Sequence, residues 1–409
     1  MSSVTSSKAR LWGLLAASGL SMVGDGVALV ATPWLILKIT GSPFDLGMAL
    51  ALQMTVGATV LVMGSPLADR YNATKVAVTA NVASAGSLSL IPLAFALNKL
   101  SLLVIVVALS LAQGTQAPGV GARQRLIRSK AEAAGVSSRR ANSVYWVLQQ
   151  TGMLIGLPVG GVLIGALGAP SALGLDAVSF LIAAVMIVVV ARNEDAVAQV
   201  VEDPRRRATY WSDLSMGVRV VVTTPALRFI GGCALILSGF DGALVPVLLP
   251  VAIHHHHQSA QVLGFLGGVY ATGMVIGATV GSAIGTRISV RRLAAISVSV
   301  VGIGYLLLGA DPHFMETGIG LIGLASGPLM PLLLTTIQVS SPTEILSRVT
   351  GAMFAVLAVS APVGVLVAGI AVRSWSVPTI CYVGSGVFLI VAATIAYRGA
   401  VLDPQDLAT

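Results

Sequence analysis

Charged residues are scarce in this sequence: Asp, Glu, Lys and Arg make up 10% of its 409 residues. Soluble globular domains carry about 25% charged residues. Hydrophobic residues reach 56% and the mean hydropathy is +0.91, so the composition excludes an ordinary soluble domain. A membrane-spanning helix needs roughly 20 apolar residues, and the chain is long enough for about a dozen such helices.

Cysteine is also rare, and both cysteines, Cys233 and Cys381, lie inside apolar segments, which argues against a disulfide framework. The sequence lacks HExxH, GxSxG and a Gly-rich phosphate loop ending in Lys-Ser/Thr. We therefore expect neither a membrane-embedded enzyme nor direct use of ATP, and no cofactor. A receptor or scaffold is a weaker alternative, because it would usually add a soluble domain. The net charge of +8 belongs to loops, so nucleic acid is not an expected partner.

Hydropathy predicts an all-α membrane protein of about twelve helices. Their approximate ranges are 11–37, 44–67, 75–97, 100–122, 141–165, 172–191, 226–252, 262–285, 291–310, 318–339, 349–371 and 377–398. The longest polar stretch, 192–225, separates two halves, 1–191 and 226–409. We interpret it as a cytoplasmic linker between two six-helix bundles.

The basic residues support this layout, because Lys and Arg gather in loops that stay in the cytoplasm. With the predicted helices, only Lys38, Lys99 and Arg373 fall on the outer side. All the others fall on the side of the termini, including Arg123 at the end of the fourth helix. The pattern predicts a multi-pass protein of the cytoplasmic membrane with both termini in the cytoplasm.

The two halves resemble each other at an offset of 216 or 217 residues. The matching pairs are Asp25-Gly26 with Asp241-Gly242, Gly47 with Gly264, Gly64 with Gly281, Arg70 with Arg287, and Lys75 with Arg292. Internal repeats of this kind are typical of secondary transporters. A chance alignment of glycine-rich helices is the alternative.

Two acids, Asp25 and Asp241, lie in the middle of predicted membrane helices, where each costs about 2.5–3.5 kcal/mol on insertion scales. An acid retained at that depth can carry protons or neutralise a cationic substrate. The alternative is a structural acid that hydrogen-bonds a neighbouring helix. Both acids are therefore candidate proton or substrate sites.

The loop after the second helix carries a glycine, an Asp-Arg pair and a lysine: Gly64, Asp69, Arg70 and Lys75. This pattern resembles the cytoplasmic signature of the major facilitator superfamily, with Asn72 in place of the second glycine. Because Asn tolerates positive φ angles, we expect Asn72 to supply the conformation of the turn. The resemblance implies a cytoplasmic gate at this loop.

The corresponding loop of the second half keeps Arg287 but has Thr286 at the position of the acid, and Arg348 opens the eleventh helix. We expect Arg287 and Arg348 to form an asymmetric second-half gate.

The fifth helix carries Gly152, Gly156, Pro158, Gly160 and Gly161. Small residues at this spacing allow helices to approach closely. A similar Gly-Pro-x-x-Gly-Gly element marks proton-exchanging exporters of the superfamily, but here the proline is displaced by one position. Close packing without a bearing on transport direction therefore stays open.

Over nearly its whole length the chain resembles the branch that contains macrolide and multidrug efflux proteins, the enterobactin exporter and lysophospholipid transporters. The residues that carry this resemblance are Gly24-Asp25-Gly26, the loop from Gly64 to Lys75, Pro118, Ala122-Arg123, Asn142 and the run that begins at Arg348.

The resemblance implies two pseudo-symmetric six-helix bundles and proton-coupled export of a hydrophobic or amphipathic small molecule, such as an antibiotic, by alternating access. Siderophore export and lysophospholipid translocation remain alternatives on the same fold, and we expect a monomer in membrane lipid. Other drug exporters often carry an arginine in helix four where this chain has Ser110. Proton coupling would then fall to Asp25 or Asp241.

Polar and aromatic side chains inside the helices suit the wall of a cavity for a bulky, partly apolar ligand. The candidates are Trp34, Gln53, Asn142, Tyr145, Gln149, Phe240 and Gln338. Hydrogen bonds between helices are the alternative role. The run from His254 to His257 lies in an outer loop, which we interpret as a flexible loop without a role. Capture of a divalent metal ion by adjacent imidazoles is the alternative.

Overall fold

The computed structural model describes residues 2–68, 71–191, 205–285, 287–342 and 345–398, and the regular structure within these ranges is helical throughout. The prediction of an all-α membrane fold is confirmed. The chain divides into two compact units. The first unit is Met1–Asp203 with Ile253–Phe265, and the second unit is Pro204–Ala252 with Leu266–Thr409.

The helices of the first half follow one another with short connections. They are α1 (Ser2–Thr40), α2 (Pro43–Ala68), α3 (Ala73–Ala96), α4 (Leu102–Ala133), α5 (Ser138–Leu167) and α6 (Ala169–Ala191). The second half opens with α7 (Arg205–Thr223), followed by α8 (Pro225–Ala243), the π-helical η1 (Leu244–Leu248) and α9 (Leu249–His255). The remaining elements are α10 (Ala260–Ile284), α11 (Val290–Ala310), η2 (Pro312–Phe314), α12 (Met315–Ser326), α13 (Leu329–Ser340), α14 (Leu346–Ala371) and α15 (Val377–Arg398).

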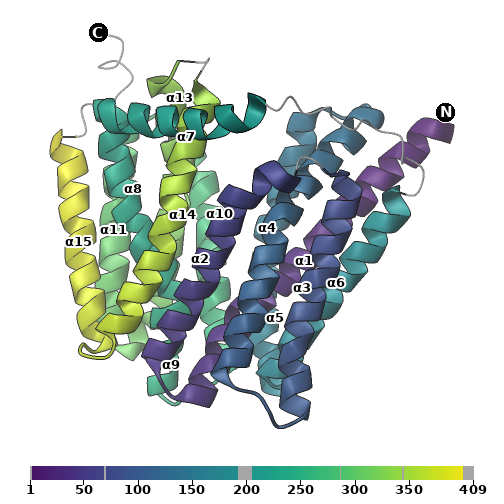
Figure 1. Ribbon diagram of the computed structural model, residues 1–409. Helices are drawn as coiled ribbons and strands as arrows, with labels where there is room; N and C mark the ends of the chain where they lie inside the picture. The colour runs from purple at the N-terminus through teal and green to yellow at the C-terminus, as the bar shows by residue number, and fades with distance from the viewer. Residues whose placement is uncertain (1, 69–70, 192–204, 286, 343–344, 399–409) are drawn as a thin grey trace. The chain divides into compact units, whose positions relative to one another are not determined.

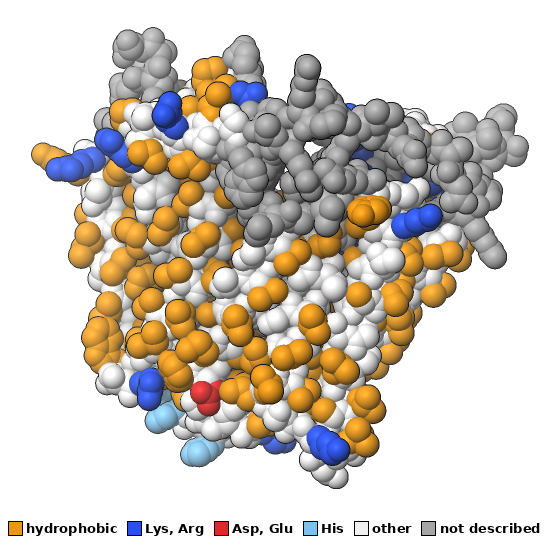
Figure 2. Space-filling model, viewed as in Figure 1, with side chains coloured by type: hydrophobic (Ala, Val, Ile, Leu, Met, Phe, Trp, Pro, Cys, Tyr) orange, Lys and Arg blue, Asp and Glu red, His pale blue; other side chains and the backbone are white. Residues whose placement is uncertain are grey.

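In the part of the chain that is described, 11 segments are long and apolar enough to cross a membrane, and each coincides with a predicted helix. The other predicted segment, 44–67, is helical as α2, whose side chains are described only as far as Val60. On the face shown in Figure 2, hydrophobic side chains are spread over the middle of the surface, while Lys and Arg lie toward its edges. This apolar surface is suited to contact with lipid.

Several helices differ from their predicted limits. The fourth was expected to end at 122, but α4 continues to Ala133 and stops just before Gly135, which has a φ of +65°. Hydropathy detects where a helix is apolar rather than where it ends. Another helix, α7, occupies most of the expected linker, and Figure 1 shows it running across the ends of α8 and α14, against which it packs.

The same packing scheme recurs in the two units. In the first unit, α1 packs against α5 and α6, and α3 packs against α4 and α6. In the second unit, α8 packs against α14 and α15, and α11 packs against α12 and α15. The predicted internal repeat is therefore present in the pairing of the helices.

Candidate functional site

Asp25 lies on α1 between two glycines that each face a different helix. A Cβ atom on Gly26 would lie 2.8 Å from the Cα of Gly156 on α5, so α1 and α5 are in backbone contact there. A Cβ atom on Gly24 would overlap the carboxyl group of Asp176 on α6. Asp25 itself accepts a hydrogen bond of 3.4 Å from the side-chain amide of Gln116 on α4. Three consecutive residues thus join α1 to three neighbouring helices.

The glycine spacing predicted for close packing on the fifth helix is confirmed. Gly152, Gly156 and Gly160, at intervals of four residues, all face the backbone of α1 between Met22 and Val27. Any larger side chain would displace one helix from the other. This contact fixes the position of Asp25 relative to α5.

Arg123 is buried within α4, with 6% of its surface exposed, and interacts electrostatically with Asp25 and Tyr145. Its Nε atom has no hydrogen-bond partner among the described residues. The expectation that the fourth helix ends at Arg123 is wrong, because α4 continues beyond its apolar part to Ala133. Although Ser110 leaves the earlier part of helix four without an arginine, the same helix brings Arg123 to Asp25.

Asp176 is a further buried acid that the sequence reasoning missed. It lies on α6 with 2% of its surface exposed, against Gly24, and it interacts electrostatically with Asp25. Ser179, one turn later, lies 3.2 Å from its Oδ1 atom. The signal was available, since Asp176 falls inside the predicted helix 172–191 and an acid there carries the same energetic cost as Asp25.

Beside this cluster, the first unit contains a polar cavity of about 350 Å³. Two predicted cavity residues, Asn142 and Tyr145, meet here. The rest of the lining is Gly121, Gln124, Arg125, Arg128 and Trp146. Of its two arginines, Arg128 is paired with Glu132 at 3.1 Å, and the lining is suited to a polar or anionic group.

Asp241 occupies the corresponding position on α8. Its Oδ1 atom accepts a hydrogen bond of 2.7 Å from the hydroxyl of Tyr270 on α10, and Tyr270 in turn is hydrogen-bonded with Ser326. Thus each half holds an intramembrane acid against a neighbouring helix. The partner is an amide in the first unit and a phenol in the second.

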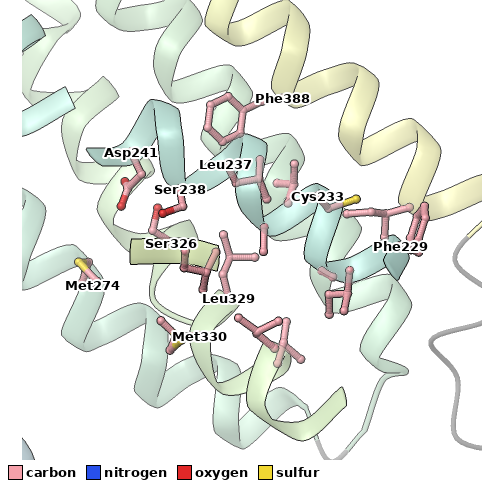
Figure 3. Close-up of a pocket in the computed structure, with 18 residues that line it drawn as sticks. Phe229, Cys233, Leu237, Ser238, Asp241, Met274, Ser326, Leu329, Met330 and Phe388 are labelled. Carbon is pink, nitrogen blue, oxygen red and sulfur yellow. The ribbon is translucent and has the colours of Figure 1, made fainter. Parts of the chain in front are cut away.

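Asp241 lines a cavity of about 210 Å³ that lies entirely within the second unit (Figure 3). Cys233, Leu237 and Asp241 recur every four residues along α8, so they lie on one face of that helix. Figure 3 shows the oxygen atoms of Ser238, Asp241 and Ser326 at one end and apolar side chains over the rest of the lining. Such a lining suits an apolar molecule with one polar or cationic group.

The residue before Asp241 differs in kind from the residue before Asp25. Phe240 packs edge-on against Tyr305 and Phe388, at ring-centroid distances of 6.4 and 5.8 Å, where the first unit places Gly24 against Asp176. Phe240, a predicted cavity residue, lines a second apolar cavity of about 350 Å³ between α8 and α14. The two halves therefore share the acid but not its surroundings.

The other predicted cavity residues are dispersed. Within the first unit, the ring of Trp34 packs edge-on against the ring of His254, with 6.2 Å between the ring centroids. Gln53 has a buried Oε1 atom without a hydrogen-bond partner among the described residues. Gln149 is half-buried on α5, and Gln338 is exposed on α13. None of these four residues lines the polar cavity of the first unit or the cavity that contains Asp241.

The gate motif is described only in part, because Asp69, Arg70 and Thr286 lie outside the described residues. Gly64 belongs to α2 and Lys75 to the first turn of α3. The expectation of a positive φ at Asn72 is wrong: its φ is −56°, and its side chain caps α3 by accepting hydrogen bonds from the amides of Thr74 and Lys75. Asn is favoured there as an N-cap.

The two second-half gate residues have different surroundings. Arg287 is exposed, whereas Arg348 on α14 donates to the sulfur of Met216 on α7 at 3.3 Å. Arg348 therefore connects α14 to the helix that follows the first half.

Comparison with known proteins gives consistent matches over most of the chain. The sequence profile of the Major Facilitator Superfamily matches residues 14–237 and 231–407. The multidrug efflux pump Tap of Mycobacterium tuberculosis is 25% identical over 362 residues, covering 87% of this chain and 85% of that protein. The enterobactin exporter EntS of Escherichia coli O1:K1 is 26% identical over 340 residues, covering 81% and 78%.

Solved structures show the same fold at low sequence identity. A bacterial homologue of the human lysosomal transporter Spinster has a TM-score of 0.74 at 13% identity, covering 98% of each chain. The nucleoside transporter NupG has a TM-score of 0.68 at 12% identity, covering 96% of this chain and 99% of its own.

Proposed function

The chain belongs to the Major Facilitator Superfamily, and on that premise we propose that it exports a hydrophobic or amphipathic small molecule, such as an antibiotic, in exchange for protons. Membership of this family and the multi-pass helical fold make it a membrane transporter. The direction of transport, the coupling ion and the class of substrate are the proposed part. Two relatives that are named as exporters, a multidrug efflux pump and an enterobactin exporter, support export.

The observation that carries the proposal is a buried acid at the same place in each half, in two different settings. Asp241 faces an apolar cavity, whereas Asp25 lies within a cluster of charged and polar side chains. An acid in an apolar cavity fits a lipophilic cation, and an acid beside a buried arginine can bind and release a proton. We assign substrate contact to Asp241 and proton exchange to Asp25.

The orientation in the membrane follows from the charge pattern, and the gates and the monomeric state are what the family resemblance implies. We place the protein in the cytoplasmic membrane as a monomer, with both termini in the cytoplasm and 192–225 as the connection between bundles 1–191 and 226–409. Alternating access would couple the two sites, with Gly64, Asp69, Arg70 and Lys75 as one gate and Arg287 and Arg348 as the other.

Drug accumulation in cells tests this function. We expect cells that express the wild-type protein to accumulate less ethidium than vector controls, and we expect a protonophore or Asp25→Asn to abolish the difference. Asp45→Asn, the same chemical change in the first turn of α2, is the matched control and should leave export intact. Export that survives both Asp25→Asn and the protonophore would contradict proton coupling through Asp25.

One observation favours a second candidate. The polar cavity of the first unit holds Arg125 and Arg128 beside Trp146, a combination that suits an anionic, partly aromatic or amphipathic ligand. Export of an anionic siderophore or translocation of a lysophospholipid would use this cavity instead of Asp241. Accumulation of ethidium that is unchanged by expression, together with release of such an anion that depends on Arg125 and Arg128, would favour this candidate.

A further inference from the structure

We propose that Asp176 is the second carboxyl group of the proton-exchange site and shares a single proton with Asp25, while Arg123 supplies the fixed positive charge. This inference rests on the proposed proton exchange and adds to it a residue on a different helix. It also gives the site a definite proton count.

Asp176 comes close to Asp25 because Gly24, the residue before Asp25, has no side chain. The carboxyl group of Asp176 lies directly against Gly24, the residue that precedes Asp25, in the space that a side chain would otherwise fill. Because α1 packs on α6, both acids are held within one bundle. Asp176 is almost wholly buried, so its carboxyl group has no bulk water with which to exchange protons directly.

The charges near the pair favour one bound proton. From α4, Arg123 interacts with Asp25, and from α5, Tyr145 interacts with both Arg123 and Asp25. If Asp25, which interacts with Arg123, and Asp176, which interacts with Asp25, were both ionised, the three groups would carry a net negative charge, which is costly in a medium of low dielectric constant. One proton makes the cluster neutral, and a second would leave the guanidinium uncompensated.

The hydrogen bonds around the two acids are compatible with a proton on Asp176. Asp25 accepts from the amide of Gln116, which suits an ionised carboxylate. The hydroxyl of Ser179 lies 2.8 Å from the main-chain oxygen of Asp176 and 3.2 Å from its Oδ1 atom. A hydroxyl has one hydrogen. When that hydrogen goes to the closer main-chain oxygen, a protonated Asp176 can donate to the hydroxyl oxygen, so the proton on Asp176 has an acceptor.

The second unit provides an internal comparison. Where the first unit has Gly24 and Asp176, the second has Phe240 packed against Phe388, and Asp241 is bonded to Tyr270. In its described part, no second acid and no arginine accompany Asp241 in its cavity. Asp241→Asn is therefore a matched control that removes an intramembrane acid without touching the pair.

Infrared difference spectroscopy of the purified full-length protein in lipid tests the pair directly, without any substrate. In the part of the signal that Asp241→Asn retains, we expect the carbonyl band of one protonated, buried carboxyl group to disappear as the pH is raised through a single step. Asp176→Asn should abolish this step, because the remaining acid, Asp25, stays ionised beside Arg123. Asp176→Glu should retain it, and Asp241→Asn should leave it unchanged.

Proteoliposomes loaded with ethidium link the pair to transport. We expect transport driven by a pH gradient to fall to the level of protein-free liposomes for Asp176→Asn and to recover with Asp176→Glu. A band that persists in Asp176→Asn, or transport by this variant at the wild-type rate, would overturn the inference. If the band behaves as expected but the wild-type protein moves no ethidium, the pair stands and the proposed substrate class fails.

Discussion

At the scale of single residues, the two glycines beside Asp25 have no side chains, and this leaves room for neighbouring helices. Gly24 leaves room for a carboxyl group from α6, and Gly26 leaves room for the backbone of α5. Neither glycine is needed for its backbone conformation, since both lie inside a regular helix. Their value is that two other helices can reach the same turn of α1.

A methyl group at Gly26 should therefore destabilise the protein. We expect Gly26→Ala to cost about 1–3 kcal/mol, the usual range for overpacking, because the new Cβ would meet backbone atoms of Gly156, which cannot rotate away. The measurement is thermal unfolding followed by size-exclusion chromatography. Gly86→Ala is the control: nothing lies within 4 Å of its added Cβ, so it should be neutral or stabilising. Equal melting of both variants would contradict this account.

At the scale of the helices, hydropathy predicts where the apolar segments lie but not where each helix ends. Asp25 and Asp241 could be predicted because an acid interrupts an apolar run, and Asp176 could have been found in the same way. The position of Arg123 could not, because residues 123–133 are mostly polar and only the continued hydrogen bonding of α4 shows that they are helical. The meeting of three buried charges on three helices depends on packing, which no single segment encodes.

Different faces of α8 line two cavities, and Cys233 can be used to probe the cavity that contains Asp241. Cys233 lines the cavity of Asp241 and is partly accessible, whereas Cys381 on α15 is buried. We expect a small maleimide to label Cys233 and not Cys381, and ethidium to slow the labelling by occupying the cavity.

Mass spectrometry of the purified protein measures this labelling, and Cys233→Ser should abolish it. Rapid modification of Cys381, or labelling of Cys233 that ethidium leaves unchanged, would argue against a substrate site in this cavity.

At the scale of the whole molecule, the distribution of basic residues predicts the orientation in the membrane. The loop between α9 and α10, which contains His256 and His257, should face outward, and both termini should face the cytoplasm. We expect alkaline phosphatase fused in that loop to be active and a fluorescent protein fused at the C-terminus to fluoresce. The opposite pattern would reverse the assignment of the gate loops to the cytoplasm.

The confinement of the paired acids to one half has an electrical consequence. If one proton returns for each monovalent cation that leaves, no net charge crosses the membrane in a cycle. The membrane potential, which contributes about 2.3 kcal/mol per elementary charge per 100 mV, then adds nothing to the driving force. Such a transporter would draw on the acidity of the surroundings alone, so its capacity would rise in acidic habitats and vanish in alkaline ones, however strongly the cell is polarised.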